Sequence, residues 1–189
     1  MAEVQLGTKA IKSVVKLNVN GTAKEFLIAH QGLPSSMYDS SCDGTWLLIE
    51  DVYENKKWHD YNVNDYANST THNYLNTTFL NLFDEDIRNA IKQAKIPYRP
   101  NKGPGTAVNW GGNGLSTQIF LLSGYEVGWD KSETGGVNYP IDGAKLDYFA
   151  MGASTSAAAK RIAYFNGEAT EWWLRSPNTS EEHGVWDIT

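Results

Sequence analysis

The residues best suited to chemistry in this sequence are aromatic and amide side chains of its second half. They stand in or beside segments rich in glycine, asparagine and serine: Asn109, Trp110, Asn113, Trp129, Asn138, Tyr139, Asn178, His183 and Trp186. Tryptophan and tyrosine give a large contact area at a low cost in conformational entropy, while amides supply adaptable hydrogen bonds. Because aromatic faces stack on sugar rings and amides bond to hydroxyls, these residues predict a ligand-binding face for a glycan, with a protein receptor as the other option.

One acidic loop offers a weaker candidate site for calcium. Asp130, Glu133 and Asp142 lie near one another in the sequence, among many backbone carbonyls. Calcium takes oxygen ligands of this kind. The Asp-x-Asp-x-Asp run of a dedicated calcium loop is missing, so a solvated acidic loop is the simpler interpretation. We expect no cofactor, with calcium as the one exception that the sequence leaves open.

The spacings that activate a catalytic group are missing. The run 111–117 is rich in glycine, but a phosphate-binding loop carries lysine where this chain has Leu115. Cys42 stands among carboxylates, which raise the pKa of a thiol and so disfavour a nucleophile. The 22 acidic residues offer so many possible glycosidase pairs that none is specific. The sequence therefore predicts a protein that is not an enzyme, and a cell-wall hydrolase stays the less favoured alternative.

The charge balance excludes two classes of partner. The 189-residue chain has 16 Lys and Arg against 22 Asp and Glu, a net charge of −6. Nucleic acids and anionic lipids attract clustered Lys and Arg, so neither is expected as a partner. Apolar runs such as 119–122 are far shorter than the roughly 18 residues that a membrane span needs. The first residues lack the apolar core of a signal peptide, and we expect no membrane insertion.

The elements that must position these residues begin with strands. Residues 13–19 and 24–29 are strand-like and flank Asn20-Gly21, which predicts a β-hairpin. A further strand is expected at 45–49, with Trp46 in the core. We also expect strands at 161–165 and 172–175, joined by the Asn166-Gly167 turn, with one of the adjacent Trp172 and Trp173 in the core because neighbours in a strand face opposite ways.

Two short helices are expected in the middle of the chain. Asn68 or Ser69 can cap the first, and Asp84 the second, which we expect to end at Pro97. Long loops rich in Gly, Asn, Ser and Pro fill 100–143. Strands, helices, loops and then strands, in that order, predict an α+β domain.

Several segments together resemble an uncharacterised domain family. They are the run 119–127 (Ile-Phe-Leu-Leu-Ser-Gly-Tyr-Glu-Val), the run 172–177 (Trp-Trp-Leu-Arg-Ser-Pro), and the shorter segments 31–38, 43–48 and 74–76. The family resembled occurs in gut Firmicutes and their phages and prophages, often in proteins called phage tail or minor structural proteins. The Leu-Ser-x-x-Glu and Trp-x-x-Ser elements are more distantly similar to elements of C-type-lectin-like folds.

The resemblance implies a C-type-lectin-like fold with an N-terminal β-hairpin, two short helices, long loops and an antiparallel sheet. The loops between Pro100 and Gly143, and those after Pro177, would form the ligand face. Formylglycine-generating enzymes of this superfamily use a cysteine pair, which a chain with the single Cys42 cannot supply. Family members continue past the position of Trp186 to a last strand. We expect one domain over 1–189, with 1–12 as a possible arm, and with that last strand missing or supplied by a partner chain.

The function implied is that of a tail- or capsid-associated phage virion protein, an adhesin that binds a bacterial surface glycan or protein receptor. It would be located in the virion, or at the bacterial cell surface if the gene is of prophage or bacterial origin. Its other partners would be virion proteins, including further copies of itself. The alternative in a different class is a purely structural decoration or connector protein of the virion.

Overall fold

The computed structural model describes residues 5–60, 64–100, 107–129, 140–151, 158–178 and 185–188. Its largest sheet has the strand order β1-β2-β3, with all pairs antiparallel. Asn20 and Gly21 both have positive φ, which fits the tight turn of the predicted hairpin. The hairpin and the third strand are confirmed as β1 (Val14–Val19), β2 (Thr22–Gly32) and β3 (Gly44–Ile49).

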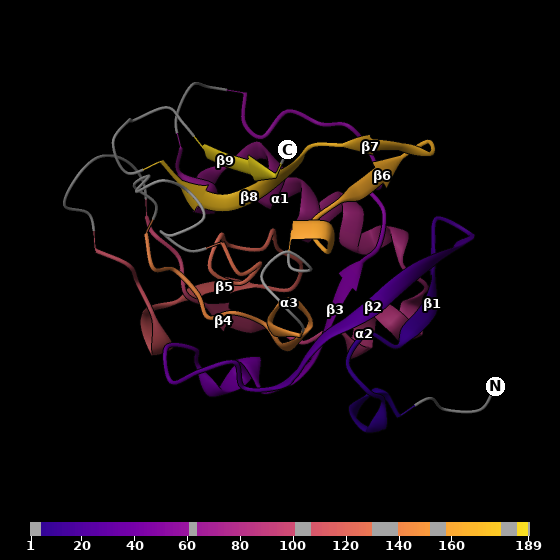
Figure 1. Cartoon of the computed structure of the whole chain (residues 1–189), viewed down its shortest axis with the longest axis horizontal. Helices are drawn as coiled ribbons and strands as arrows, with labels where there is room; N and C mark the ends of the chain where they lie inside the picture. Colours follow the sequence, from indigo (N-terminus) through magenta and orange to yellow (C-terminus); the bar gives the residue numbers. More distant parts are fainter. Residues whose placement is uncertain are drawn as a thin grey trace.

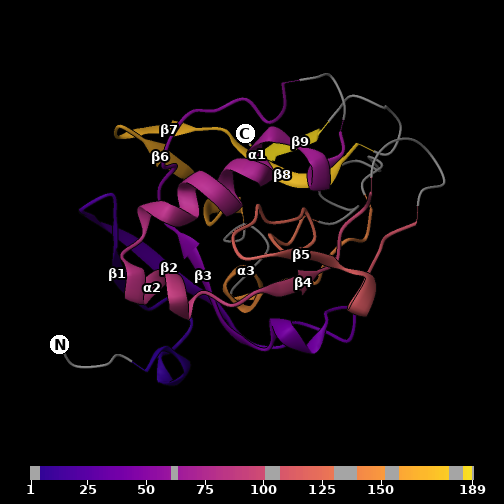
Figure 2. The same cartoon turned by 180° about the vertical axis from the view of Figure 1, so that it is seen from behind.

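A helical segment covers one side of this sheet, and it faces the viewer in Figure 2. Ser69 caps it as predicted, because its Oγ accepts a hydrogen bond from the His72 N–H at 3.0 Å. Its parts are α1 (Thr70–Tyr74), the π-helical turn η4 (Leu75–Phe79), the 3-10 turn η5 (Leu80–Leu82) and, after Phe83, α2 (Glu85–Ala90).

Two expectations for α2 are wrong. Asp84 stands at the N-cap position, but its carboxylate accepts no cap bond and instead accepts from Asn18 Nδ2 at 2.9 Å. The helix ends at Ala90 rather than at Pro97, because residues 94–96 pair with 115–117 in a small sheet.

The described residues also form three two-stranded antiparallel sheets. The Asn166-Gly167 turn joins β6 to β7, so the prediction that it joins β6 to the strand at 172 is wrong. That strand belongs to a separate pair, β8 with β9. The remaining elements are β4 (Ala94–Ile96), β5 (Leu115–Thr117), α3 (Asp147–Ala150), β6 (Ala163–Phe165), β7 (Glu168–Thr170), β8 (Trp172–Pro177), β9 (Val185–Ile188) and the 3-10 turns η1 (Leu6–Thr8), η2 (Ser40–Cys42), η3 (Tyr66–Asn68) and η6 (Gly111–Asn113).

In Figure 1 the β8-β9 pair lies above α3 and the β4-β5 pair, and the β1-β2-β3 sheet lies to their right. Residues 5–12 follow β2 rather than extending away from it. Gln31 Nε2 donates to the carbonyls of Leu6 and Lys9, and the Lys12 N–H donates to Ile28 O. Among the described residues, no helix is both long and apolar enough to cross a bilayer.

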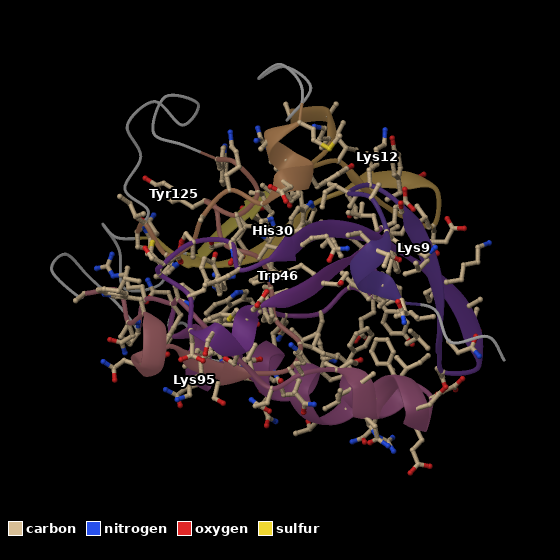
Figure 3. All side chains as sticks on the ribbon, turned by 90° about the horizontal axis from the view of Figure 1, so that it is seen from below. Lys9, Lys12, His30, Trp46, Lys95 and Tyr125 are labelled. Carbon is tan, nitrogen blue, oxygen red and sulfur yellow. The ribbon has the colours of Figure 1, made fainter. Side chains whose placement is uncertain are left out.

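The core has two parts, one on each face of the large sheet. The first core cluster includes Leu27, Leu122, Phe149 and Leu174, and the second is formed by Val19, Phe26, Phe79 and Phe83. Trp46 is buried in the first cluster, as predicted, with its ring edge-on to His30 at a centroid distance of 6.4 Å (Figure 3).

The neighbouring tryptophans of β8 also divide as predicted. Trp172 packs against the first core cluster, while Trp173 is 38% exposed. The described elements thus form a mixed α+β protein with small antiparallel sheets and few helices, which confirms the α+β class predicted from the order of the elements.

Candidate functional site

Three of the predicted ligand-contacting residues lie together on one tight turn, here named the Trp110 turn (Asn109–Asn113). Asn109 exchanges two backbone hydrogen bonds with Tyr98, at 3.0 and 2.8 Å, and the Gly111 N–H donates to Met37 O at 2.9 Å. Gly111 has φ of +55°, a conformation that suits glycine. The backbone of the turn is therefore held from two sides.

The side chains of the Trp110 turn face solvent. Trp110 is 57% exposed, the highest value among the large exposed hydrophobic residues, and Asn113 is exposed beside it on η6. An exposed indole next to an exposed amide, on a backbone held by hydrogen bonds, can stack on a flat ligand and bond to its polar edge.

Of the other predicted residues, the structure describes the side chains of Trp129 and Asn178, and it places both away from this turn. Trp129 packs against the first core cluster, so its assignment to an exposed face needs correction. Asn178 is half-buried, and its carbonyl accepts from Asn64 Nδ2 at 3.2 Å. Trp186 lies in β9. Asn138, Tyr139 and His183 lie outside the described residues.

The calcium hypothesis receives no support from Asp142. This carboxylate is fully buried and accepts from Ser176 Oγ, while Asp130 and Glu133 lie outside the described residues. Within the described ranges, no group of three or more His, Cys, Asp or Glu side chains could hold a metal ion.

The two motifs that carry the resemblance meet in the interior. Arg175 Nη1 and Nη2 donate to Glu126 Oε2 and Oε1 at 2.5 and 2.7 Å, and both side chains are 0% exposed. The three other N–H groups of the guanidinium donate to the carbonyls of Pro97, Leu121 and Asp142. Every donor of this buried cation is thus satisfied, which a buried charge requires.

Glu126 is also held by its own segment. Its Oε2 accepts from the Ser123 N–H at 2.9 Å, and its N–H donates to Ser123 Oγ at 3.2 Å. This reciprocal pattern is a capping box, and it explains the Ser-x-x-Glu spacing of the motif. Tyr38 Oη donates to Glu126 Oε1 at 2.7 Å, and the Gly124 N–H donates to Ser176 Oγ at 3.0 Å.

Burial and these charges shift the pKa of each partner. Burial, together with Glu126, raises the pKa of Tyr38 far above its ordinary value. Burial alone would lower the pKa of Arg175, but Glu126 and Asp142 raise it. Burial raises the pKa of Asp142 to about 6, although Arg175 acts in the opposite direction. Because these groups are closed to solvent, the network braces the fold rather than acting on a substrate.

Two further titratable groups could suggest catalysis, and neither forms a complete site among the described residues. Burial raises the pKa of the Cys42 thiol to about 11, and the thiol donates to Lys95 O. His30 Nδ1 lies 2.8 Å from Asp147 Oδ2, while its buried Nε2 has no hydrogen-bond partner in the structure. A nucleophile that this histidine could activate is not found within the described residues.

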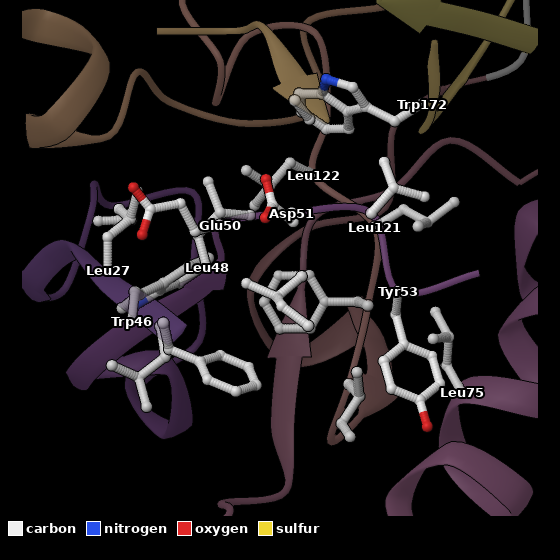
Figure 4. A pocket seen from close by; sticks show the side chains of 18 of the residues that line it. Leu27, Trp46, Leu48, Glu50, Asp51, Tyr53, Leu75, Leu121, Leu122 and Trp172 are labelled. Atoms are coloured by element: carbon white, nitrogen blue, oxygen red, sulfur yellow. The ribbon is translucent and has the colours of Figure 1, made fainter. Parts of the chain in front are cut away.

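A cleft of about 1100 Å³ lies along β3 and the residues that follow it (Figure 4). We name it the β3 cleft. Its opposite walls come from residues 118–122, 159–164 and 170–173. Leu48, Leu121 and Trp172 give it apolar surface, and the exposed Glu50 and Asp51 stand among these apolar side chains (Figure 4). Sequence patterns did not indicate it, because its walls come from distant segments.

Comparison with known proteins identifies the family and little more. Residues 43–189 match the family model described as "Domain of unknown function (DUF6273)". This match covers well over half of the chain, so the chain belongs to the DUF6273 family. It begins directly before β3, and β1 and β2 therefore lie outside it. No curated protein and no solved structure matches the chain.

Proposed function

We propose that this member of the DUF6273 family is a non-enzymatic recognition protein, a phage adhesin that binds a host-surface glycan through the Trp110 turn. The observation that carries the proposal is the exposure of Trp110 beside Asn113 on a turn whose backbone is held by Tyr98 and Met37. A rigid, exposed indole binds a sugar ring with little loss of conformational entropy.

The finer fold and the biological setting belong to the same proposal. We assign the fold to the C-type-lectin-like kind, because the Leu-Ser-x-x-Glu and Trp-x-x-Ser elements are similar to elements of that fold and the buried ion pair between Glu126 and Arg175 fastens their two segments together. Such a scaffold leaves the loops free to carry ligand-contacting residues. We place the protein in the tail or capsid of a virion, from the resemblance of these same segments to phage structural proteins.

The experiment that tests the proposal compares Trp110→Ala and Asn113→Ala with the unchanged protein on a glycan array, followed by titration calorimetry of each glycan retained. Tyr164→Ala is the matched control, since Tyr164 is another exposed aromatic residue, 47% exposed on β6. We expect Trp110→Ala to weaken glycan binding at least tenfold and Tyr164→Ala to leave it unchanged.

Two results would count against the proposal. One is a glycan affinity that Trp110→Ala does not alter, which would move the site elsewhere. The other is the absence of binding to any glycan on the array together with host-cell adsorption that survives Trp110→Ala. Trp110→Ala, Asn113→Ala and Tyr164→Ala must each keep the unfolding midpoint of the unchanged protein. We expect this because all three side chains are exposed.

A further inference from the structure

The free edge of β3 carries an inference that does not depend on the Trp110 turn. We propose that an extended segment of a partner protein enters the β3 cleft and adds to the sheet as a fourth strand, with basic residues placed against Glu50 and Asp51. The chemistry that recognises it is backbone hydrogen bonding along β3, apolar contact with the cleft walls, and charge pairing at one end.

The alternation of backbone hydrogen bonds along β3 shows which of its N–H and C=O groups face the cleft. The Glu50 N–H donates to Glu25 O at 3.1 Å, so residue 50 points its polar backbone groups at β2. In an antiparallel pair these groups alternate along the strand. Leu48 therefore also points at β2, whereas Leu47 and Ile49 point their N–H and C=O groups away from it.

The hydrogen bonds of β2 confirm independently that the backbone groups of Leu47 point away from β2. Leu47 lies opposite Ile28, whose N–H and C=O are both bonded on the β1 side, to Ser13 O and the Lys12 N–H, at 2.9 Å each. The pair of Ile28 and Leu47 is thus a non-hydrogen-bonded pair. In the part of the chain that the structure describes, β3 has β2 as its one neighbouring strand, and no backbone hydrogen bond of Leu47 or Ile49 leads away from the sheet.

The cleft has room for a strand at this edge. Residues 44–56 line it without a break. Beyond the strand the Val52 N–H donates to Tyr164 O of β6 at 3.0 Å, so the edge proposed for strand addition is that of β3 itself, residues 44–49. Its volume of about 1100 Å³ lies just above the roughly 300–1,000 Å³ range of small-molecule pockets. Leu47, Leu48 and Ile49 are all half-buried, as expected for an edge that a further strand can cover.

The acidic residues of the β3 cleft indicate what kind of partner segment it would bind. Glu50 and Asp51 are adjacent and exposed at the end of β3, and neither takes part in the ion pairs found between described residues. Glu54 also lines the cleft; its carboxylate accepts a hydrogen bond from Tyr74, and its buried Oε1 has no hydrogen-bond partner among the described residues. The lining holds six acidic residues (Glu25, Glu50, Asp51, Glu54, Glu171 and Asp187) and four basic ones (Lys56, Lys92, Lys160 and Arg161). This acidic excess, with the adjacent Glu50 and Asp51, favours a strand that places lysine or arginine against that pair and apolar residues at alternate positions.

The first test is amide hydrogen exchange in the protein alone. We expect the amides of Leu47 and Ile49 to exchange at least 100-fold faster than those of Leu48 and Glu50, because the latter two donate to β2. If the Leu47 and Ile49 amides are as slow as their neighbours, the edge is already occupied or closed and the proposal is wrong.

The second test selects binders from a displayed library of random nine-residue peptides. We expect the enriched peptides to carry a basic cluster at one end and alternating apolar residues, and to slow exchange of Leu47 and Ile49. N-methylation of the edge-facing amides of one such peptide should abolish its binding, while N-methylation of the amides between them should not.

Variants of the protein test the charge step with the same peptide. Glu50→Gln with Asp51→Asn should weaken its binding at least tenfold, and Glu168→Gln, an exposed carboxylate on β7 outside the cleft, should not. Three results would overturn the proposal. The library could give no enriched peptide, or the enriched peptides could slow exchange at amides other than those of Leu47 and Ile49. The third is that a saccharide, rather than a peptide, slows exchange at Leu47 and Ile49. These measurements do not depend on whether Trp110→Ala loses glycan binding. The proposal for the β3 cleft and the proposal for the Trp110 turn can therefore be tested, and disproved, independently.

Discussion

Arg175 and Glu126 form a bidentate ion pair that is fully closed to solvent, with Nη2–Oε1 and Nη1–Oε2 distances of 2.7 and 2.5 Å. It joins β8 to the segment after β5, across 49 residues of sequence. Both ions are desolvated at a cost that only their mutual geometry and added hydrogen bonds offset. The stability of the fold therefore depends on both partners being present together.

Removing one partner of this pair should be strongly destabilising. We expect Arg175→Met to lower the free energy of unfolding by about 3–5 kcal/mol, because it leaves the Glu126 carboxylate buried without its cation. Urea denaturation followed by circular dichroism measures this. The double variant Arg175→Met with Glu126→Leu should recover part of the loss, since no uncompensated charge is then left in the core.

The exposed pair of Lys16 and Glu25, 3.0 Å apart, is the control for this prediction. We expect Lys16→Met to change the free energy of unfolding by less than about 1 kcal/mol, because water already screens these charges. Equal losses in Arg175→Met and Lys16→Met would show that the buried pair has no special role.

Gly143 should not tolerate a side chain. An added Cβ would lie 2.5 Å from Ser123 Oγ, 2.9 Å from Glu126 Cγ and 3.0 Å from Tyr38 Oη. Gly143→Ala should therefore disturb the buried network and lower the free energy of unfolding by about 1–3 kcal/mol. Gly112→Ala is the matched control, since nothing lies within 4 Å of its added Cβ. A Gly143→Ala protein as stable as the control would contradict the packing described for this network.

Asp142 should make stability depend on pH in an unusual direction for a carboxyl group. Burial raises its pKa from 3.8 to about 6, so the folded protein holds this proton more tightly than the unfolded chain. The stabilisation is fully present below about pH 4 and is lost as the pH rises through 6, by up to about 3 kcal/mol at roughly 1.4 kcal/mol per unit.

The Asp142→Asn variant cannot ionise at this position, so comparing it with the unchanged protein isolates the contribution of Asp142 protonation to the free energy of unfolding. We expect the difference in free energy of unfolding between the unchanged protein and the variant to fall between pH 4 and pH 7, and to stay constant above that. Burial lowers the pKa of His72, which acts in the opposite sense as the pH falls below 6.5. Since His72 is present in both proteins, its contribution cancels in the difference. A difference that does not vary with pH would show that Asp142 ionises normally.

Cys42 should be unreactive in the folded protein. With its pKa at about 11 rather than 9.0, the thiol has about 100-fold less thiolate at pH 8, and burial also blocks access. We expect its reaction with iodoacetamide to be slowed by at least that factor, and to reach the rate of a free thiol in concentrated urea. Rapid modification without urea would show that the Cys42 segment opens readily.

Local signals in the sequence were enough for the hairpin and for the first helix. Asn20-Gly21 determines its own turn, and Ser69 caps the residues that directly follow it. Prediction from sequence failed where the end of an element depends on pairing with a distant segment. The helix expected to reach Pro97 stops at Ala90 because residues 94–96 pair with a strand about 20 residues later.

The candidate site shows the same division. Trp110 stands next to a glycine turn and is exposed, as its setting predicted. Trp129 has a similar loop setting but packs against the first core cluster, because Val127 and the neighbouring core residues bring it there. The partnership of Glu126 with Arg175 has no local signal at all, since each half of the pair is an ordinary charged residue until the chain folds.

The contacts described for the Glu126–Arg175 pair come from Tyr38, Pro97, Leu121, Ser123 and Asp142, which are widely separated along the chain. Residues that share one buried network do not tolerate substitution independently, because a change at one position alters the free-energy cost of a change at another. We therefore expect these distant positions to constrain one another, so that a replacement at one is accepted only together with a matching replacement at its partner.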